Sequence, residues 1–111
     1  MKRTVFILVS GDPGKGARPV EAVRVAAGLS VHERLAVTLC LAGESARVLD
    51  DDCEDCVDGE RVPEFLEILK LSGARVLAGG QRVGPTPAGV QTVTEQELQR
   101  EMSGADRVLR F

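Results

Sequence analysis

The stretch that decides the fold is Val5-Phe6-Ile7-Leu8-Val9, an apolar run that ends at Ser10-Gly11-Asp12-Pro13. The run is continuous rather than alternating, which is typical of a central parallel strand covered on both faces. The loop from Ser10 to Arg18 is rich in glycine and proline, and it leads to Pro19, which suits the first turn of a helix. A buried strand, a tight loop and a helix in this order predict an α/β fold.

The rest of the chain continues this alternation. Apolar residues recur at helical spacing after Pro19 and again after Pro63, whereas short apolar runs of strand length occur elsewhere. Thr94 and Glu97 have the spacing of a capping box at the start of a further helix. The predicted strands are 5–9, 35–42, 75–78, 90–93 and 106–111, and the predicted helices are 19–30, a short one at 44–49, 63–73 and 94–104.

The order of these segments predicts one α/β domain over residues 1–111. We expect a doubly wound, mostly parallel sheet of about five strands with helices on both faces. A chain of 111 residues has the usual size of a single domain, so a second independent core is not expected. Ligands of such sheets bind beyond the carboxyl ends of the strands. The loops 10–16, 43–59 and 79–89 should therefore lie together.

Composition narrows the functional classes. The net charge is −3, but seven acidic residues lie between Asp50 and Glu60, which leaves ten acidic against 14 basic residues elsewhere. The three aromatic residues are all Phe, and no stripe interleaves them with basic residues, which argues against nucleic acid as a partner. The opening apolar run is too short for a membrane span or signal peptide, so we expect a cytoplasmic protein without a membrane partner.

Cys53 and Cys56 form a C-x-x-C pair, which is the candidate site for thiol chemistry. Zinc usually requires four ligands, and the chain has no second C-x-x-C and only His32 as an imidazole, so we expect no metal and no cofactor. The surrounding acidic residues disfavour a thiolate. The pair is therefore either a functional thiol site or an incidental pair of exposed or disulfide-forming cysteines. Cys40 is expected to be a small buried hydrophobe.

The acidic segment also raises the question of calcium. Its order, Asp50-Asp51-Asp52-Cys53-Glu54-Asp55, lacks the glycine that an EF-hand needs at the sixth position, and Arg61 stands where a bidentate glutamate is required. We expect a solvated loop here and no EF-hand.

A second candidate site is the glycine-rich loop after the first strand. Its backbone amides and Lys15 could hold an anion beside the following helix. The loop matches neither a P-loop nor the G-x-G-x-x-G pattern, and a flexible connection is the alternative. The candidate ligand-binding residues are Gly11, Asp12, Gly14 and Lys15, joined by Gly79, Gly80 and Arg82 after the third predicted strand.

The strand 4–9 with Ser10-Gly11, the helix 20–29, the strand 37–43 and the ending 105–111 together resemble the DsrE/DsrF family of sulfur-relay proteins, including its TusD-type and DsrH/TusB-type subunits. The resemblance covers nearly the whole chain. It implies assembly as a homo-oligomer or with related DsrE-like subunits, and sulfur-relay proteins as partners. Sulfurtransferase members carry a persulfide-forming cysteine just after the third strand. Here that stretch reads Val76-Leu77-Ala78-Gly79-Gly80-Gln81, without a cysteine.

Two main functional hypotheses follow. The first is a DsrE-like accessory or sulfur-carrier protein of intracellular sulfur metabolism that lacks the usual persulfide cysteine, with Cys53 or Cys56 as the local substitute. The second is a non-enzymatic oligomeric binding module for a small anion or a protein partner. A metal- or redox-responsive regulator is a third reading, and whether the protein is an enzyme stays open.

Overall fold

The computed structural model describes residues 2–50, 55–79 and 89–111. Within these residues, five strands form one sheet in which every pairing is parallel, in the order β4-β3-β2-β1-β5. The predicted sheet of about five mostly parallel strands is confirmed. The strands are β1 (Arg3–Val9), β2 (Leu35–Ala42), β3 (Arg75–Gly79), β4 (Val90–Val93) and β5 (Arg107–Arg110).

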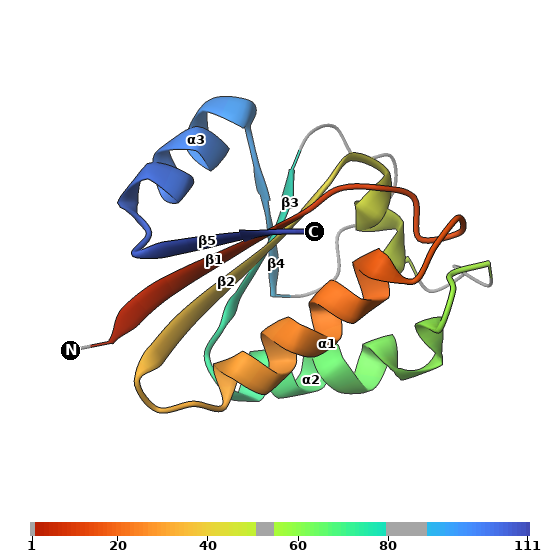
Figure 1. Ribbon diagram of the computed structural model, residues 1–111, viewed down its shortest axis with the longest axis horizontal. Coiled ribbons are helices and arrows are strands. Elements are labelled where there is room, and N and C mark those ends of the chain that lie inside the picture. Colours follow the sequence, from red (N-terminus) through yellow and green to blue (C-terminus); the bar gives the residue numbers. More distant parts are fainter. Residues whose placement is uncertain (1, 51–54, 80–88) are drawn as a thin grey trace.

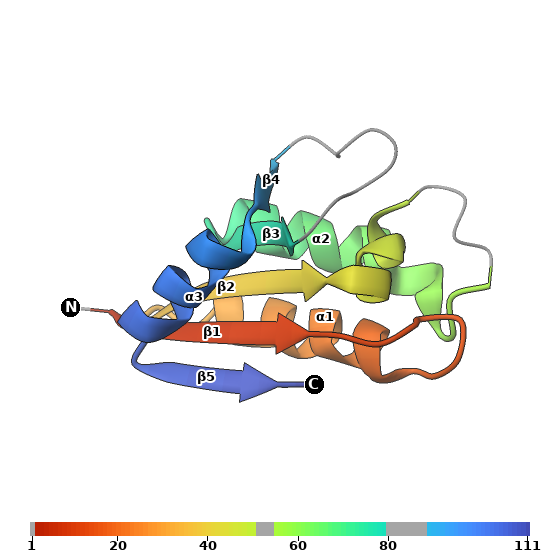
Figure 2. The ribbon, with the colours of Figure 1, turned by 90° about the horizontal axis from the view of Figure 1, so that it is seen from above.

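Helices cover both faces of the sheet, as predicted. Helices α1 (Arg18–Ser30) and α2 (Val62–Leu71) lie side by side on one face, and α3 (Glu95–Gly104) lies on the other (Figures 1 and 2). Two 3-10 helices, η1 (Gly43–Leu49) and η2 (Gly59–Arg61), follow β2 and precede α2. The chain builds β1 to β4 in sequence across the sheet, and α3 then returns it to the opposite edge at β5. This reversal makes the domain doubly wound.

Strand β1 shows why its sequence is a continuous apolar run. Ile7 and Val9 point into the larger core, which α1 and α2 cover, whereas Phe6 belongs to a smaller core beneath α3. All three side chains are at most 1% exposed. Each such burial stabilises the fold by about 1.5–3 kcal/mol. The smaller core consists of few fully buried side chains: Phe6, Cys40, Leu77, Val93 and Leu98.

Local chemistry accounts for the helix starts. Pro19 lies in the first turn of α1. Helix α3 begins with the predicted capping box, in which Glu97 N donates to Thr94 Oγ1 and Thr94 N donates to Glu97 Oε1, both at 3.1 Å. The predicted short helix at 44–49 is the 3-10 helix η1. Its fully buried Ser45 hydroxyl lies 3.0 Å from the Val9 carbonyl oxygen and 2.7 Å from that of Ala42, which ties η1 to the ends of β1 and β2.

The last strand is fixed to the first by a side-chain clamp. Thr4 N donates to Asp106 Oδ2 at 2.8 Å, and Asp106 N donates to Thr4 Oγ1 at 2.8 Å. The bonds that Thr4 N and the Thr4 hydroxyl donate to Asp106 Oδ2 lower the pKa of this carboxyl group, because they favour its charged form. The clamp sets where β5 begins to pair with β1, so that Phe6 lies opposite Val108. No helix in the described part of the chain is long and apolar enough to cross a membrane.

Candidate functional site at the carboxyl edge of the sheet

Three segments meet beyond the carboxyl ends of β1 and β2: the loop 10–17, η1 and the segment 55–61 (Figure 1). The meeting of the first two predicted loops is therefore observed in their described parts. Of the proposed thiol pair, Cys53 lies outside the described residues. Gly80 and Arg82, two of the proposed ligand-binding residues, also lie outside them.

Arg47 joins these segments. Its Nη1 donates to Asp12 Oδ1 at 2.7 Å, and its Nη2 lies 2.7 Å from each carboxylate oxygen of Asp55. The hydrogen bonds from Arg47 lower the pKa of Asp55, and the same bonds raise the pKa of Arg47. One guanidinium thus holds two carboxylates that come from different loops. We call Asp12, Arg47 and Asp55 the Arg47 network.

The backbone of the first loop folds around this network. Gly14 N donates to Asp12 Oδ1 at 2.8 Å, and Lys15 N donates to the Asp12 carbonyl oxygen at 3.0 Å. A Cβ atom on Gly14 would lie 2.6 Å from Asp55 Oδ2, so a side chain at this position would displace Asp55. Val57 N donates to the Pro13 carbonyl oxygen at 2.8 Å, which adds a main-chain link between the two segments.

Cys56 lies between the two anchored residues Asp55 and Val57. Its side chain is half-buried, packs against the larger core and is disulfide-bonded. A Cβ atom on Gly59 would lie 2.8 Å from Cys56 Cβ, so the turn that follows also needs a residue without a side chain. Residues 51–54 of the predicted solvated loop lie outside the described residues, and Asp55, Val57 and Asp58 are exposed, in keeping with the prediction. Asp55 and Val57 are nevertheless fixed to η1 and to the loop 10–17 by their bonds to Arg47 and Pro13.

The proposed anion-binding residues Gly11, Asp12, Gly14 and Lys15 lie together in the first loop. The Gly14 amide is already bonded to Asp12, and the Asp12 carboxylate faces its own loop, whereas Lys15 and Gly11 are exposed. Gly79 ends β3, two strands away from β1, and it is buried. The amides that could cradle an anion are therefore partly occupied by an internal carboxylate.

Cys40 is buried, as expected, with no exposed surface. Burial raises the pKa of its thiol to about 11, and Glu95 adds to the shift. A Cβ atom on Gly79 would lie 3.6 Å from Cys40 Sγ, so the thiol lies next to Gly79 at the end of β3. A neutral thiol without access to solvent is a poor nucleophile. His32 is exposed, and its Nδ1 accepts from Arg34 N at 3.2 Å.

Sequence reasoning missed Arg47. Arginine in a short helix has no distinctive spacing, and its partners lie 35 and 8 residues away along the chain.

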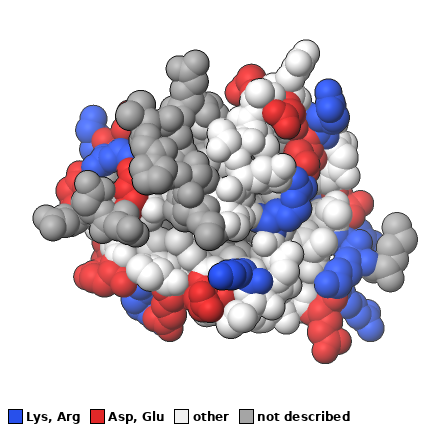
Figure 3. Space-filling model, turned by 180° about the vertical axis from the view of Figure 1, so that it is seen from behind, with Lys and Arg blue, Asp and Glu red and all other residues white. Residues whose placement is uncertain are grey.

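On the side of the molecule opposite to Figure 1, basic and acidic side chains are interspersed around a broad uncharged area (Figure 3).

Neither a family model nor a curated protein matches this sequence. A solved structure does match: the chain superposes on the crystal structure of the ychN protein from E. coli with a TM-score of 0.79. The match covers 100% of both chains at 24% sequence identity. The chain therefore has the same fold as the ychN protein from end to end.

Proposed function

We propose that this chain is a DsrE-like accessory or sulfur-carrier protein of intracellular sulfur metabolism. The support is the full-length similarity of its fold to the ychN protein, a DsrE/DsrF-like protein, together with the sequence resemblance to that family. Cys56 carries the chemical part of the proposal, because it is the described cysteine at the carboxyl edge of the sheet, and its neighbours fix it there. Cys53 is the proposed second member of the thiol pair.

The proposed chemistry begins from the reduced protein. A dithiol reductant supplies two electrons to the disulfide of Cys56 and is itself oxidised to a disulfide. The Cys56 thiolate then attacks the outer sulfur of a sulfane-sulfur donor, whose sulfur–sulfur bond breaks, and the donor leaves as a thiolate. The product is a persulfide on the protein, which a second thiolate can accept in turn.

The experiment is intact-mass analysis of the reduced protein after incubation with inorganic polysulfide, beside a sulfur carrier that is known to load. We expect a mass gain of one sulfur atom, which a reductant removes and which is absent from Cys56→Ser or Cys53→Ser. Cys40→Ser is the matched control and should load as the wild type does, because Cys40 is inaccessible. If the known carrier loads and this chain does not, the sulfur-carrier role is wrong.

The second candidate is a non-enzymatic oligomeric binding module. The observation that favours it is the stretch Val76-Leu77-Ala78-Gly79, which closes β3 without a cysteine. Sedimentation analysis of the full chain, alone and with a related DsrE-like subunit, tests this candidate. We expect an assembly larger than the monomer that persists in Cys56→Ser, and a monomer under both conditions would contradict it.

A further inference from the structure

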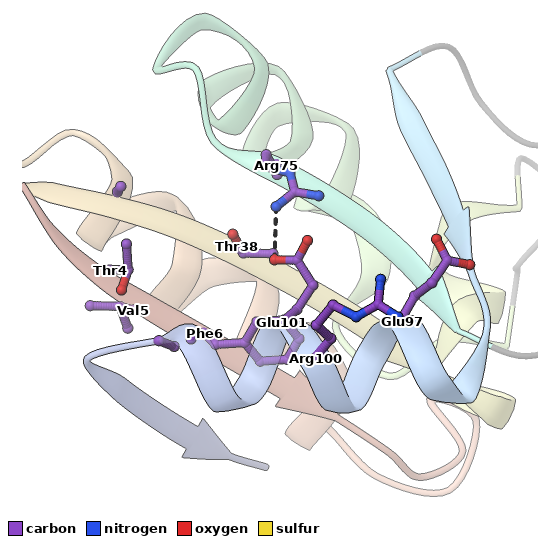
Figure 4. Close-up of a pocket in the computed structure, with 11 residues that line it drawn as sticks. Thr4, Val5, Phe6, Thr38, Arg75, Glu97, Arg100 and Glu101 are labelled. Atoms are coloured by element: carbon purple, nitrogen blue, oxygen red, sulfur yellow. Dashed lines mark hydrogen bonds and ion pairs between the residues drawn. The ribbon is translucent and has the colours of Figure 1, made fainter.

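A cavity of about 450 Å³ lies between α3 and the amino-terminal parts of β1, β2 and β3, on the sheet face away from α1 and α2 (Figure 4). Its volume is within the range of pockets that hold small molecules. The Arg47 network lies at the other end of the strands, so the cavity is separate from the proposed thiol site and is independent of the proposed function.

The strand register explains the floor of the cavity. Phe6 in β1 pairs with Thr38 in β2, and Thr38 pairs with Arg75 in β3. Because adjacent strands lie about 4.8 Å apart and paired residues project on the same face, the floor changes from an aromatic ring through a hydroxyl to a guanidinium. In the preceding row, Thr4 pairs with Ala36. These small side chains leave space beneath the end of α3 at Gly104.

The acidic groups around the cavity already have partners. Glu101 Oε2 accepts from Arg75 Nη1 at 2.9 Å, which is the pair drawn as a dashed line in Figure 4. Glu97 Oε1 accepts from Thr94 N in the capping box. Both carboxylates are therefore engaged within the fold.

Donor groups around the cavity are less occupied. Among the residues that the structure describes, Arg75 Nη2 bonds only to Gln91 Oε1, at 3.5 Å, which is a weak hydrogen bond. Within residues 2–50, 55–79 and 89–111, the Thr38 hydroxyl makes no hydrogen bond. Arg100 at the rim forms no hydrogen bond or close ion pair there, although its charge helps to lower the pKa of Glu97. A ligand that fits must therefore accept hydrogen bonds from Arg75, can also accept one from the Thr38 hydroxyl, and presents an apolar part toward the half-buried Ala36 and Ala105.

We propose that this cavity binds a small organic monocarboxylate. The apolar body of the ligand lies against Ala36 and Ala105, and its carboxylate accepts from the Thr38 hydroxyl and from Arg75 Nη2, while Arg100 adds positive charge at the rim. An amine of the same shape cannot accept from Arg75, and the two glutamates of the lining, Glu97 and Glu101, are already bonded to Thr94 N and Arg75. A neutral amide keeps one acceptor oxygen but loses the attraction to charge.

The test is an amide NMR titration of the full chain with 3-phenylpropionate, 3-phenylpropionamide and phenethylamine. We expect saturable shifts from the acid at residues 4–6, 36–38, 75 and 97–105, with a dissociation constant on the order of 1 mM or tighter. The amide should bind at least about tenfold more weakly than the acid. Absence of saturable shifts with the acid, or equal binding of acid and amide or of acid and amine, overturns the proposal.

Two variants locate the binding. Thr38→Val keeps the shape of the floor and removes the hydroxyl, and Ala36→Leu fills the cavity; each should weaken binding of the acid at least about tenfold. Thr92→Val is the matched control, because Thr92 is an exposed strand residue outside the cavity lining. Well-dispersed amide spectra will show that each variant is folded. If either Thr38→Val or Ala36→Leu binds the acid as the wild type does, the assignment is wrong.

Discussion

At the scale of single residues, Arg47 joins segments that are far apart in the sequence. Its guanidinium connects η1 with Asp12 in one loop and Asp55 in another, and Gly14 has no side chain to displace Asp55. No local pattern in the sequence predicts this arrangement, because the three residues meet only after the strands have been placed. The network holds Cys56 in position by fixing the residue before it.

Replacing Arg47 with glutamine should release both segments. We expect Arg47→Gln to lower the melting temperature and to speed amide hydrogen exchange at Gly14 and Val57, because their bonds depend on the order of the two loops. Exchange measured by mass spectrometry is the readout. Arg61→Gln is the control, since Arg61 forms an exposed ion pair with Glu64 outside the network. Equal exchange in the two variants would contradict the role given to Arg47.

The same contact predicts a dependence of stability on pH. Arg47 holds the pKa of Asp55 below its usual value, so the ion pair stabilises the folded state above the ordinary aspartate pKa of about 3.9. This contribution is lost as the pH falls through the lowered pKa. The difference in unfolding free energy between wild type and Asp55→Asn should therefore shrink between about pH 7 and about pH 3. Urea unfolding across this range measures it, and a constant difference would argue against the ion pair.

At the scale of elements, the stability of α3 depends on its N-terminal cap more than the stability of α1 or α2 does. It alone covers its face of the sheet in the described structure, and Leu98 is the one residue of the helix that is fully buried. Its capping box satisfies amides at the helix N-terminus that would otherwise lack partners. The sequence predicts this box correctly, because capping depends on residues three positions apart.

The cap gives a quantitative prediction. Thr94→Ala should destabilise the domain by about 1 kcal/mol, because the side-chain acceptor for Glu97 N is lost. Thr94→Ser keeps an acceptor oxygen and should retain most of the stability. Urea unfolding of the three proteins measures the difference. If serine and alanine prove equally destabilising, the hydroxyl is not the cause.

At the scale of the whole molecule, local sequence patterns predicted the strands and helices. The cavity and the position of Asp55 depend instead on contacts between residues far apart in the sequence. The apolar run at Val5–Val9 and the capping residues act over a few positions, so strands, helices and their order could be derived from the sequence. The cavity depends on Thr38 lying between Phe6 and Arg75, which is a matter of register between strands. The fixed position of Asp55 likewise depends on a partner that only the folded chain brings near.

The two faces of the sheet are covered unequally, and this difference determines where substitutions can accumulate during evolution. Most buried side chains lie on the face of α1 and α2, so substitutions there are constrained by folding. The α3 face has few such side chains, and the residues that line its cavity include small, hydroxylated and charged ones. Selection can therefore alter what the α3 face recognises while the opposite layer preserves the fold.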